Sequence, residues 1–186
     1  MSRQKILAGN WKMNFGAAEA LGYFSAIEEL IPAAIPGTYR VIFPPAYCLG
    51  QDVQKAAANA SMLLGAQNVH WEEKGAFTGE LSGSVLKANG ITWVLIAHSE
   101  RRQFFGESDT SACKRLKKSM ELGLNIIFCV GETLAEREAN QTEAVLKRQI
   151  EPFTTVYKDL KNSYTGVCSI AYEPVWAIGT GKTATP

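Results

Sequence analysis

The chain has 186 residues, 46% of them hydrophobic and 20% charged, which is the composition of an ordinary globular protein. The formal net charge of +1 provides no basic field for nucleic acid or anionic lipid, and the strictly apolar runs are too short to span a bilayer. The basic start has no long apolar stretch behind it, which argues against a secretory signal and favours a chain without nucleic-acid or membrane partners.

In chain order, short apolar runs alternate with amphipathic stretches. The runs predict strands, and apolar residues at helical spacing predict helices over 21–31, 109–123 and 146–160. The second helix is expected to be capped by Asp109 and ended by Gly123. The six predicted strands are 5–11, 39–45, 61–69, 92–99, 125–131 and 168–174.

Strands that read as near-continuous apolar runs are covered on both faces, which indicates an α/β protein with a parallel sheet built from βα units. Periodicity leaves two architectures open, an open doubly wound sheet or a sheet curved toward a barrel. No linker, low-complexity tract or charge run divides the chain, so we expect residues 1–186 to form a single domain.

The four cysteines lack the paired spacing of a zinc site, and two histidines are too few to complete one. We therefore expect reduced thiols, a cytoplasmic location and no metal site.

Polar side chains end several of the predicted strands. Sites in parallel α/β proteins form beyond the carboxyl ends of the strands, so these side chains are candidates for chemistry. A carboxylate can take a proton from carbon, an imidazole can polarise a carbonyl, and an ammonium group can neutralise an anion. Together they suit proton abstraction next to a carbonyl. The candidates are Asn10, Lys12, His98, Glu100, Cys129, Glu132 and Glu173.

Each candidate also has a structural explanation when taken alone. Lys12 can be a solvated charge and His98 can hydrogen-bond within a turn, whereas Glu100 beside Arg101 and Arg102 suggests an ion-pair network. Cys129 and Trp176 are expected to be packing residues. Ser99 can cap a short helix after His98, and the positive end of that helix favours a neutral imidazole.

The stretch 174–184 starts with a stiff proline and carries glycines at 179 and 181. It is longer than a usual strand-to-helix turn, and long ordered loops of this kind are often lids. Glycine also lets backbone N–H groups approach a phosphate. The alternative is a long loop without a function.

Five separated motifs, "GNWKMN", "GAQNVHWEEKGAFTGE", "IAHSERR", "FCVGETL" and "AYEPVWAIGTGKTATP", resemble the triosephosphate isomerase family in order along the whole chain. The resemblance implies a (β/α)8 TIM barrel rather than an open sheet. It also implies a glycolytic and gluconeogenic enzyme that interconverts dihydroxyacetone phosphate and glyceraldehyde 3-phosphate without metal or cofactor.

The resemblance assigns roles to the candidates. Glu173 would be the base, His98 the electrophile, and Lys12 with Asn10 would hold the substrate, while Gly179 would bind its phosphate. Glu100 and Cys129 would support the site. The implied lid is Pro174, Val175, Trp176, Ala177, Ile178, Gly179, Thr180, Gly181, Lys182, Thr183 and Ala184.

The loop around residues 68–80 resembles the family's dimer loop, with Phe77 and Thr78 at its tip. The resemblance therefore implies a homodimer in which this tip inserts beside the partner's residues 10–13. The alternative is an exposed Ω-loop.

A barrel of this kind usually takes about 250 residues, whereas six predicted strands account for about six βα units. The barrel is therefore expected to be C-terminally incomplete here, with a predicted helix start at Thr185 and Pro186. Two consequences stay open. The chain could need a separate C-terminal segment that completes the barrel, or it could be a catalytically silent scaffold.

Overall fold

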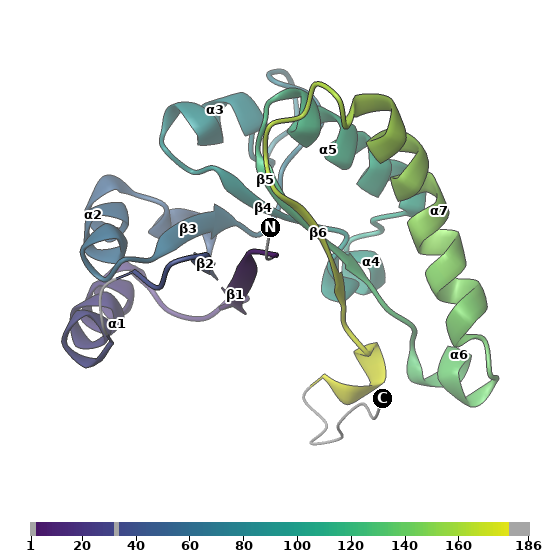
Figure 1. Cartoon of the computed structure of the whole chain (residues 1–186), viewed down its shortest axis with the longest axis horizontal. Coiled ribbons are helices and arrows are strands. Elements are labelled where there is room, and N and C mark those ends of the chain that lie inside the picture. The colour runs from purple at the N-terminus through teal and green to yellow at the C-terminus, as the bar shows by residue number, and fades with distance from the viewer. Residues whose placement is uncertain (1–2, 32–33, 179–186) are drawn as a thin grey trace.

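The computed structural model describes residues 3–31 and 34–178. Within them, six parallel strands form one curled sheet in the order β1-β2-β3-β4-β5-β6, with the helices outside it (Figure 1). All six predicted strands are confirmed, each of them shorter than predicted. They are β1 Lys5–Asn10, β2 Thr38–Phe43, β3 Leu63–Ala66, β4 Trp93–Ile96, β5 Asn125–Val130 and β6 Cys168–Tyr172.

The sequential strand order distinguishes between the two predicted architectures. A doubly wound sheet reverses its strand order at a switch point, whereas here each crossover moves one strand further in the same direction. Right-handed crossovers that never reverse leave all helices on one face, so the sheet curls around its other face. The fold is therefore an arc of about six βα units of a TIM barrel.

The longer helices flank the strands they connect, and the predicted caps are off by one residue. Ser108 rather than Asp109 caps the helix over 109–121, because the Ser108 and Ser111 side chains bond each other's backbone N–H. Gly123 follows the end of this helix at a φ of +69°, as predicted. The helices are α1 Ala17–Leu30, α2 Gln51–Asn59, α3 Gly83–Ala88, α4 Ser99–Phe104, α5 Asp109–Glu121, α6 Leu134–Glu138 and α7 Thr142–Leu160, with short 3-10 turns η1 Ala46–Cys48 and η2 Val175–Ala177. Among the described residues, none of these helices has the length and apolar character needed to cross a membrane.

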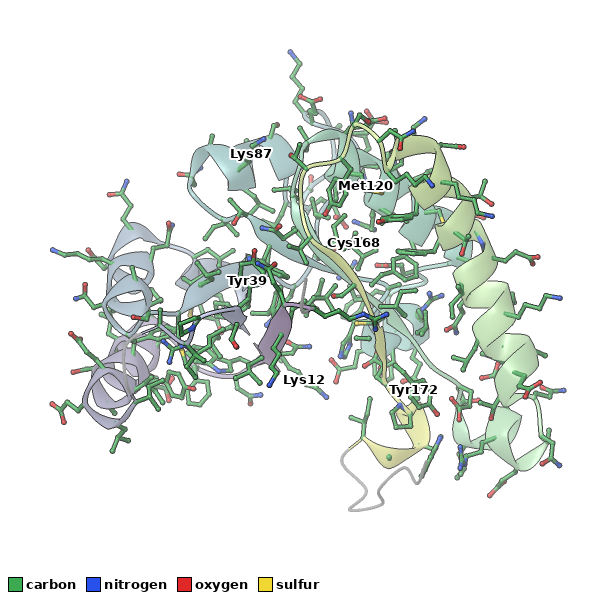
Figure 2. The ribbon with its side chains drawn as sticks, in the orientation of Figure 1. Lys12, Tyr39, Lys87, Met120, Cys168 and Tyr172 are labelled. Atoms are coloured by element: carbon green, nitrogen blue, oxygen red, sulfur yellow. The ribbon has the colours of Figure 1, made fainter. Side chains whose placement is uncertain are left out.

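The core has two layers, because successive strand residues point to opposite faces of the sheet. The larger layer lies between the sheet and the outer helices, where Met120 packs, and the smaller one fills the inside of the arc, where Tyr39 packs (Figure 2). The inner layer contains Val41, Phe43, Trp93, Leu95, Ile127 and Cys129.

Trp93 is the largest side chain of the inner layer and only 1% of it is exposed. Replacing a buried aromatic residue with alanine leaves a cavity, so Trp93→Ala is expected to lower the free energy of unfolding by about 3–5 kcal/mol. Urea denaturation measures the effect. Leu30→Ala, at a side chain that is 77% exposed, is the control and should change stability by less than about 0.5 kcal/mol. An equal loss in both variants would contradict this description of the core.

The arc is open at both ends within the described residues. There β1 pairs only with β2, and β6 pairs only with β5. Leu7 on β1 and Ile170 on β6 are 57% and 43% exposed although both lie on strands. The apolar surface beside β1 also lines a groove with the underside of α1, near Ile27 and Ile31. Both edges thus present unpaired backbone and apolar side chains.

Candidate active site

The carboxyl ends of β1, β4 and β6 bring the predicted residues to one rim of the arc. Asn10 is the last residue of β1, His98 follows β4 after one residue, and Glu173 directly follows β6. Figure 2 shows Lys12 just beyond the end of β1. The parallel strand direction therefore gathers residues that are up to 163 positions apart in the sequence, counting from Asn10 to Glu173 (173 − 10).

Lys12 has a φ of +54°, and side chains hold both polar groups of its backbone. Its N–H donates to Asn10 Oδ1 at 2.9 Å, and its carbonyl accepts Gln67 Nε2 at 2.7 Å. Lys12 Nζ lies 2.7 Å from Glu100 Oε1. Glu100 thus pairs with Lys12, whereas Arg101 and Arg102 pair elsewhere. The ion pair keeps the ammonium group at the rim.

His98, rather than Ser99 as predicted, is the N-cap of α4. Its Nδ1 accepts the backbone N–H of Glu100 at 3.3 Å, so the ring proton of the neutral form sits on Nε2. Nε2 lies 3.2 Å from Glu173 Oε2. In that tautomer the imidazole can donate Nε2–H toward Glu173 from its place at the N-terminus of α4.

Glu173 accepts the backbone N–H of Ser99 at 2.7 Å through Oε1, and its side chain is 17% exposed. Burial raises the pKa of Glu173 above the usual glutamate value, although His98 and the Ser99 N–H act in the opposite direction. A carboxylate with a raised pKa is a stronger base, and this property suits proton transfer from carbon.

Two neighbouring elements fix the position of Glu173. The Glu173 N–H donates to the Val130 carbonyl at 2.8 Å, which extends the pairing of β5 and β6. Gln149 on α7 bonds both the N–H and the carbonyl of Gly131. A Cβ at Gly131 would lie 1.9 Å from the Glu173 carbonyl oxygen, so only glycine permits this close approach.

A pocket of about 240 Å³ opens at the ends of β1 and β4, with the Lys12 ammonium and the His98 imidazole in its wall. It can hold a small anionic carbonyl compound, because one wall carries a cation and another carries a hydrogen-bond donor next to a base. The lining residues are Asn10, Lys12, Met13, Gln67, His98, Glu100, Arg101 and Phe105.

Comparison with known proteins agrees with this chemistry. A family model described as "Triosephosphate isomerase" matches residues 5–186. Proteins named triosephosphate isomerase from Alkaliphilus metalliredigens and Solibacter usitatus are both 47% identical to the chain, over 98% and 99% of its length, and the one from Chlorobium phaeobacteroides is 44% identical over 99%. These matches span 71–72% of the relatives' lengths. The chain belongs to the triosephosphate isomerase family.

The resemblance to the triosephosphate isomerase family also gave Cys129 a supporting place in the site. Its side chain is 4% exposed and lies in the inner core layer. Burial, with the nearby Glu173 carboxylate, raises the pKa of the Cys129 thiol well above its usual value, so the sulfur stays protonated. Cys129 therefore packs in the inner core layer next to Glu173.

The first residues of the predicted lid are held by Glu132, whose side chain is fully buried. Glu132 Oε1 accepts Trp176 Nε1 at 3.0 Å and the Tyr172 hydroxyl at 3.0 Å, and the Glu132 carbonyl accepts the Val175 N–H at 3.2 Å. The Arg137 guanidinium lies 4.2 Å from the centre of a Trp176 ring. Trp176 is therefore tied to the end of β5, beyond the packing role predicted for it.

Burial alone would raise the pKa of Glu132, but hydrogen bonds from the backbone, Trp176, Tyr172 and Arg137 outweigh it and hold the pKa below the usual value. The stability that ionised Glu132 contributes is therefore present above the ordinary glutamate pKa of about 4.3 and is lost as pH falls through the lowered value. Wild type should exceed Glu132→Gln in urea midpoint at pH 7, and the difference should shrink as pH falls below about 4.3 and vanish below the lowered pKa of Glu132. A difference that does not depend on pH would rule out this role. Glu151→Gln on the exposed side of α7 is the control.

The predicted dimer loop is held by contacts among its own aromatic rings and by contacts with α5. The His70 ring lies 4.2 Å from the rings of both Trp71 and Phe77, counted between centroids. Arg115 on α5 pairs with Glu80 at 3.0 Å and also bonds the Val69 carbonyl. At the tip Phe77 is 41% exposed and Thr78 is exposed.

The remaining calls at the end of the chain, Gly179, residues 180–184 of the predicted lid and the helix start predicted at 185–186, lie outside the described residues.

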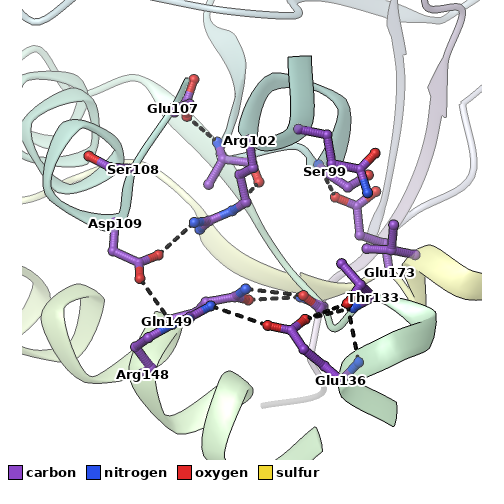
Figure 3. Close-up of a pocket in the computed structure, with 14 residues that line it drawn as sticks. Ser99, Arg102, Glu107, Ser108, Asp109, Thr133, Glu136, Arg148, Gln149 and Glu173 are labelled. Atoms are coloured by element: carbon purple, nitrogen blue, oxygen red, sulfur yellow. Dashed lines mark hydrogen bonds and ion pairs between the residues drawn. The ribbon is translucent and has the colours of Figure 1, made fainter. Parts of the chain in front are cut away.

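A second cavity, of about 310 Å³, borders Ser99 and Glu173 on the side of α5 and α7 (Figure 3). Its charged groups pair with one another, since Arg102 and Arg148 lie 2.5 Å and 3.4 Å from the two carboxylate oxygens of Asp109. Glu173 lines this cavity and not the 240 Å³ pocket, whose wall holds its neighbour His98.

Gln67, Glu107 and Gln149 contribute to the site without having been predicted from the sequence. Each carries a long side chain that reaches the backbone of another element. No local pattern marks such residues, because their partners lie far away in the sequence. For Gln67, its place at the end of the third apolar run was the one available signal.

Proposed function

We propose that the protein interconverts dihydroxyacetone phosphate and glyceraldehyde 3-phosphate. The observation that carries this proposal is the 3.2 Å approach of His98 Nε2 to Glu173 Oε2 at the rim that also holds Lys12, in a chain of the triosephosphate isomerase family. Members of that family named triosephosphate isomerase share this length of sequence with the chain.

In the proposed reaction, the Glu173 carboxylate removes a proton from the carbon next to the substrate carbonyl. His98 Nε2–H donates to the carbonyl oxygen, which becomes a hydroxyl group of an enediol, and the Lys12 ammonium stabilises the negative charge that develops. Glu173 then returns the proton to the former carbonyl carbon, while the hydroxyl group on the other carbon gives its proton to His98 Nε2 and becomes the new carbonyl group. No electrons enter or leave, so the residues at the rim are sufficient for the chemistry. Asn10 and Lys12 hold the substrate at one end of the pocket.

Phosphate binding completes the proposal. We assign this role to the Gly179 N–H within the lid 174–184, which closes over the bound triose. Trp176 and Tyr172 support this assignment, because their hydrogen bonds to Glu132 give the start of the lid a defined resting position.

Within residues 3–31 and 34–178, β1 and β6 each pair on one side only, which favours a completed barrel as the active form. A TIM barrel closes with eight strands, and two further βα units would pair both edges and cover Leu7 and Ile170. Two βα units that complete the barrel are therefore part of the proposed assembly. The alternative is a catalytically silent scaffold that associates through the same edges.

A homodimer through the loop 68–80 and a cytoplasmic location also belong to the proposal. The exposed Phe77 ring at the tip of an internally packed loop supports the dimer, because it is the kind of anchor that fills a pocket on a partner.

The test is isomerisation of glyceraldehyde 3-phosphate by the chain alone and by the chain joined to the last two βα units of a relative. Turnover in the joined protein that exceeds turnover in the chain alone is expected. The proposal fails if the joined protein is inactive and Glu173→Asp changes nothing. In that case a monodisperse assembly in sedimentation would establish the scaffold alternative.

A further inference from the structure

Ala97, the residue between β4 and His98, has a φ of +64° and is 1% exposed. This left-handed conformation is unfavourable for any residue with a Cβ, whereas glycine adopts it freely. The chain therefore carries local strain at the point where it turns from the strand into His98, and something must hold that turn in place.

Two charged side chains bond the two polar groups of the Ala97 backbone. Its N–H donates to Glu107 Oε1 at 2.8 Å, and its carbonyl accepts Arg102 Nε at 2.9 Å. These bonds lie on either side of the Ala97 Cα, so together they restrict both of its backbone dihedrals. Hydrogen bonds to charged groups are stronger than neutral ones, and the Glu107 side chain is only 1% exposed.

Glu107 is itself fixed from two directions. Arg101 Nε lies 2.8 Å and Arg115 Nε 3.6 Å from Glu107 Oε2. The backbone N–H of Arg101 donates to the His98 carbonyl at 2.9 Å, so the ion pair spans the first turn of α4. Glu107 thus connects the residue before His98 with the helix after it.

Glu107 lines the 310 Å³ cavity together with Glu173 and is not among the residues that line the 240 Å³ pocket (Figure 3). The contacts of the His98 ring are comparatively long, at 3.3 Å to the Glu100 N–H and 3.2 Å to Glu173. The orientation of the ring therefore depends on the backbone that carries it.

We propose that Glu107 is a positioning residue, which holds Ala97 in the left-handed conformation and so directs the His98 imidazole toward the substrate and Glu173. The expected effect of Glu107 on catalysis rests on the proposed function. Its expected effect on the orientation of the His98 ring does not.

The test uses the full chain, and the chain joined to the last two βα units for turnover. Glu107→Ala removes the carboxylate that accepts the Ala97 N–H. Ala97→Gly removes the Cβ that makes the left-handed conformation of residue 97 unfavourable. The chain has two histidines, so the ring ¹⁵N signals of His98 can be followed by NMR and assigned by comparison with His98→Gln. Glu107→Met, which removes the acceptor but keeps the length of the side chain, serves if Glu107→Ala does not fold.

Glu107→Ala is expected to shift the His98 ring signals and to lower kcat by about ten- to a hundredfold, with KM changed less than about twofold. Adding Ala97→Gly should restore at least part of both. Ala97→Gly alone should raise the Tm by about 2–4 °C. Ala112→Gly, in α5 after Glu107, is the destabilised control and should lower the Tm without moving His98 or kcat.

The inference is overturned if the Glu107 variants lose stability while the His98 signals stay in place, or if Ala97→Gly rescues nothing. The NMR result stands whether or not the protein turns over a triose phosphate. Failure of this inference is therefore distinguishable from failure of the proposed function.

Discussion

Glu173→Gln is expected to lower kcat by about a thousandfold or more, because the amide cannot take a proton from carbon and general bases contribute about 10²- to 10⁴-fold. The pKa of Glu173 is higher in the folded protein than in the unfolded chain, so the ionised carboxylate lowers the free energy of unfolding at neutral pH. This loss disappears only when the pH falls below the pKa that Glu173 has in the unfolded chain. The variant should therefore melt no lower than wild type. A steady-state assay with thermal melting separates the two effects.

Two comparisons sharpen this prediction. Glu173→Asp keeps the charge but shortens the side chain, so it should retain more activity than Glu173→Gln. In wild type, kcat/KM should fall on the acid side as pH drops through the raised pKa of Glu173, at a higher pH than a free glutamate would give. Equal kcat in wild type and Glu173→Gln would remove Glu173 from the reaction.

Lys12→Met is expected to lower kcat/KM by about 10²- to 10³-fold, because the variant keeps the length of the side chain and removes the positive charge that faces the substrate. The Lys12 ammonium lies 2.7 Å from Glu100, so its loss also leaves one carboxylate in the wall of the pocket without a counter-charge. Both effects disfavour an anionic substrate, and KM should rise as kcat falls.

Lys5→Met is the matched control, since Lys5 is exposed at the opposite end of the same strand, β1. It should leave kcat and KM within about twofold of wild type. The role of Lys12 is wrong if both lysine variants behave alike, or if raising the ionic strength removes the difference between Lys12→Met and wild type entirely.

The strands and the rim could be predicted because both have local signals. Apolar runs mark the strands, and parallel pairing gathers their polar ends, so Lys12, His98 and Glu173 came together without knowledge of the fold. The curvature of the sheet had no local signal and was predicted only from the resemblance to a family. Strand order decides curvature, and strand order is a property of long-range pairing.

The N-terminal helix caps and the supporting residues could not be predicted from local sequence patterns. Ser108 and His98 are the caps where Asp109 and Ser99 were predicted, because their side chains accept the first free N–H groups of the two helices, whereas Asp109 pairs with Arg102. Glu107 reaches Ala97 across ten residues, and Gln149 reaches Gly131 across eighteen. Such contacts depend on how α5 and α7 pack on the sheet.

The sequential strand order also determines how the molecule can be made. Each strand pairs with the one synthesised just before it, so every new βα unit finds its partner already exposed when it leaves the ribosome. Folding can therefore proceed by growth from the N-terminal side, as in repeat proteins, without waiting for distant parts of the chain. The growing end always presents an unpaired strand, which makes chaperone binding during translation most useful at that edge.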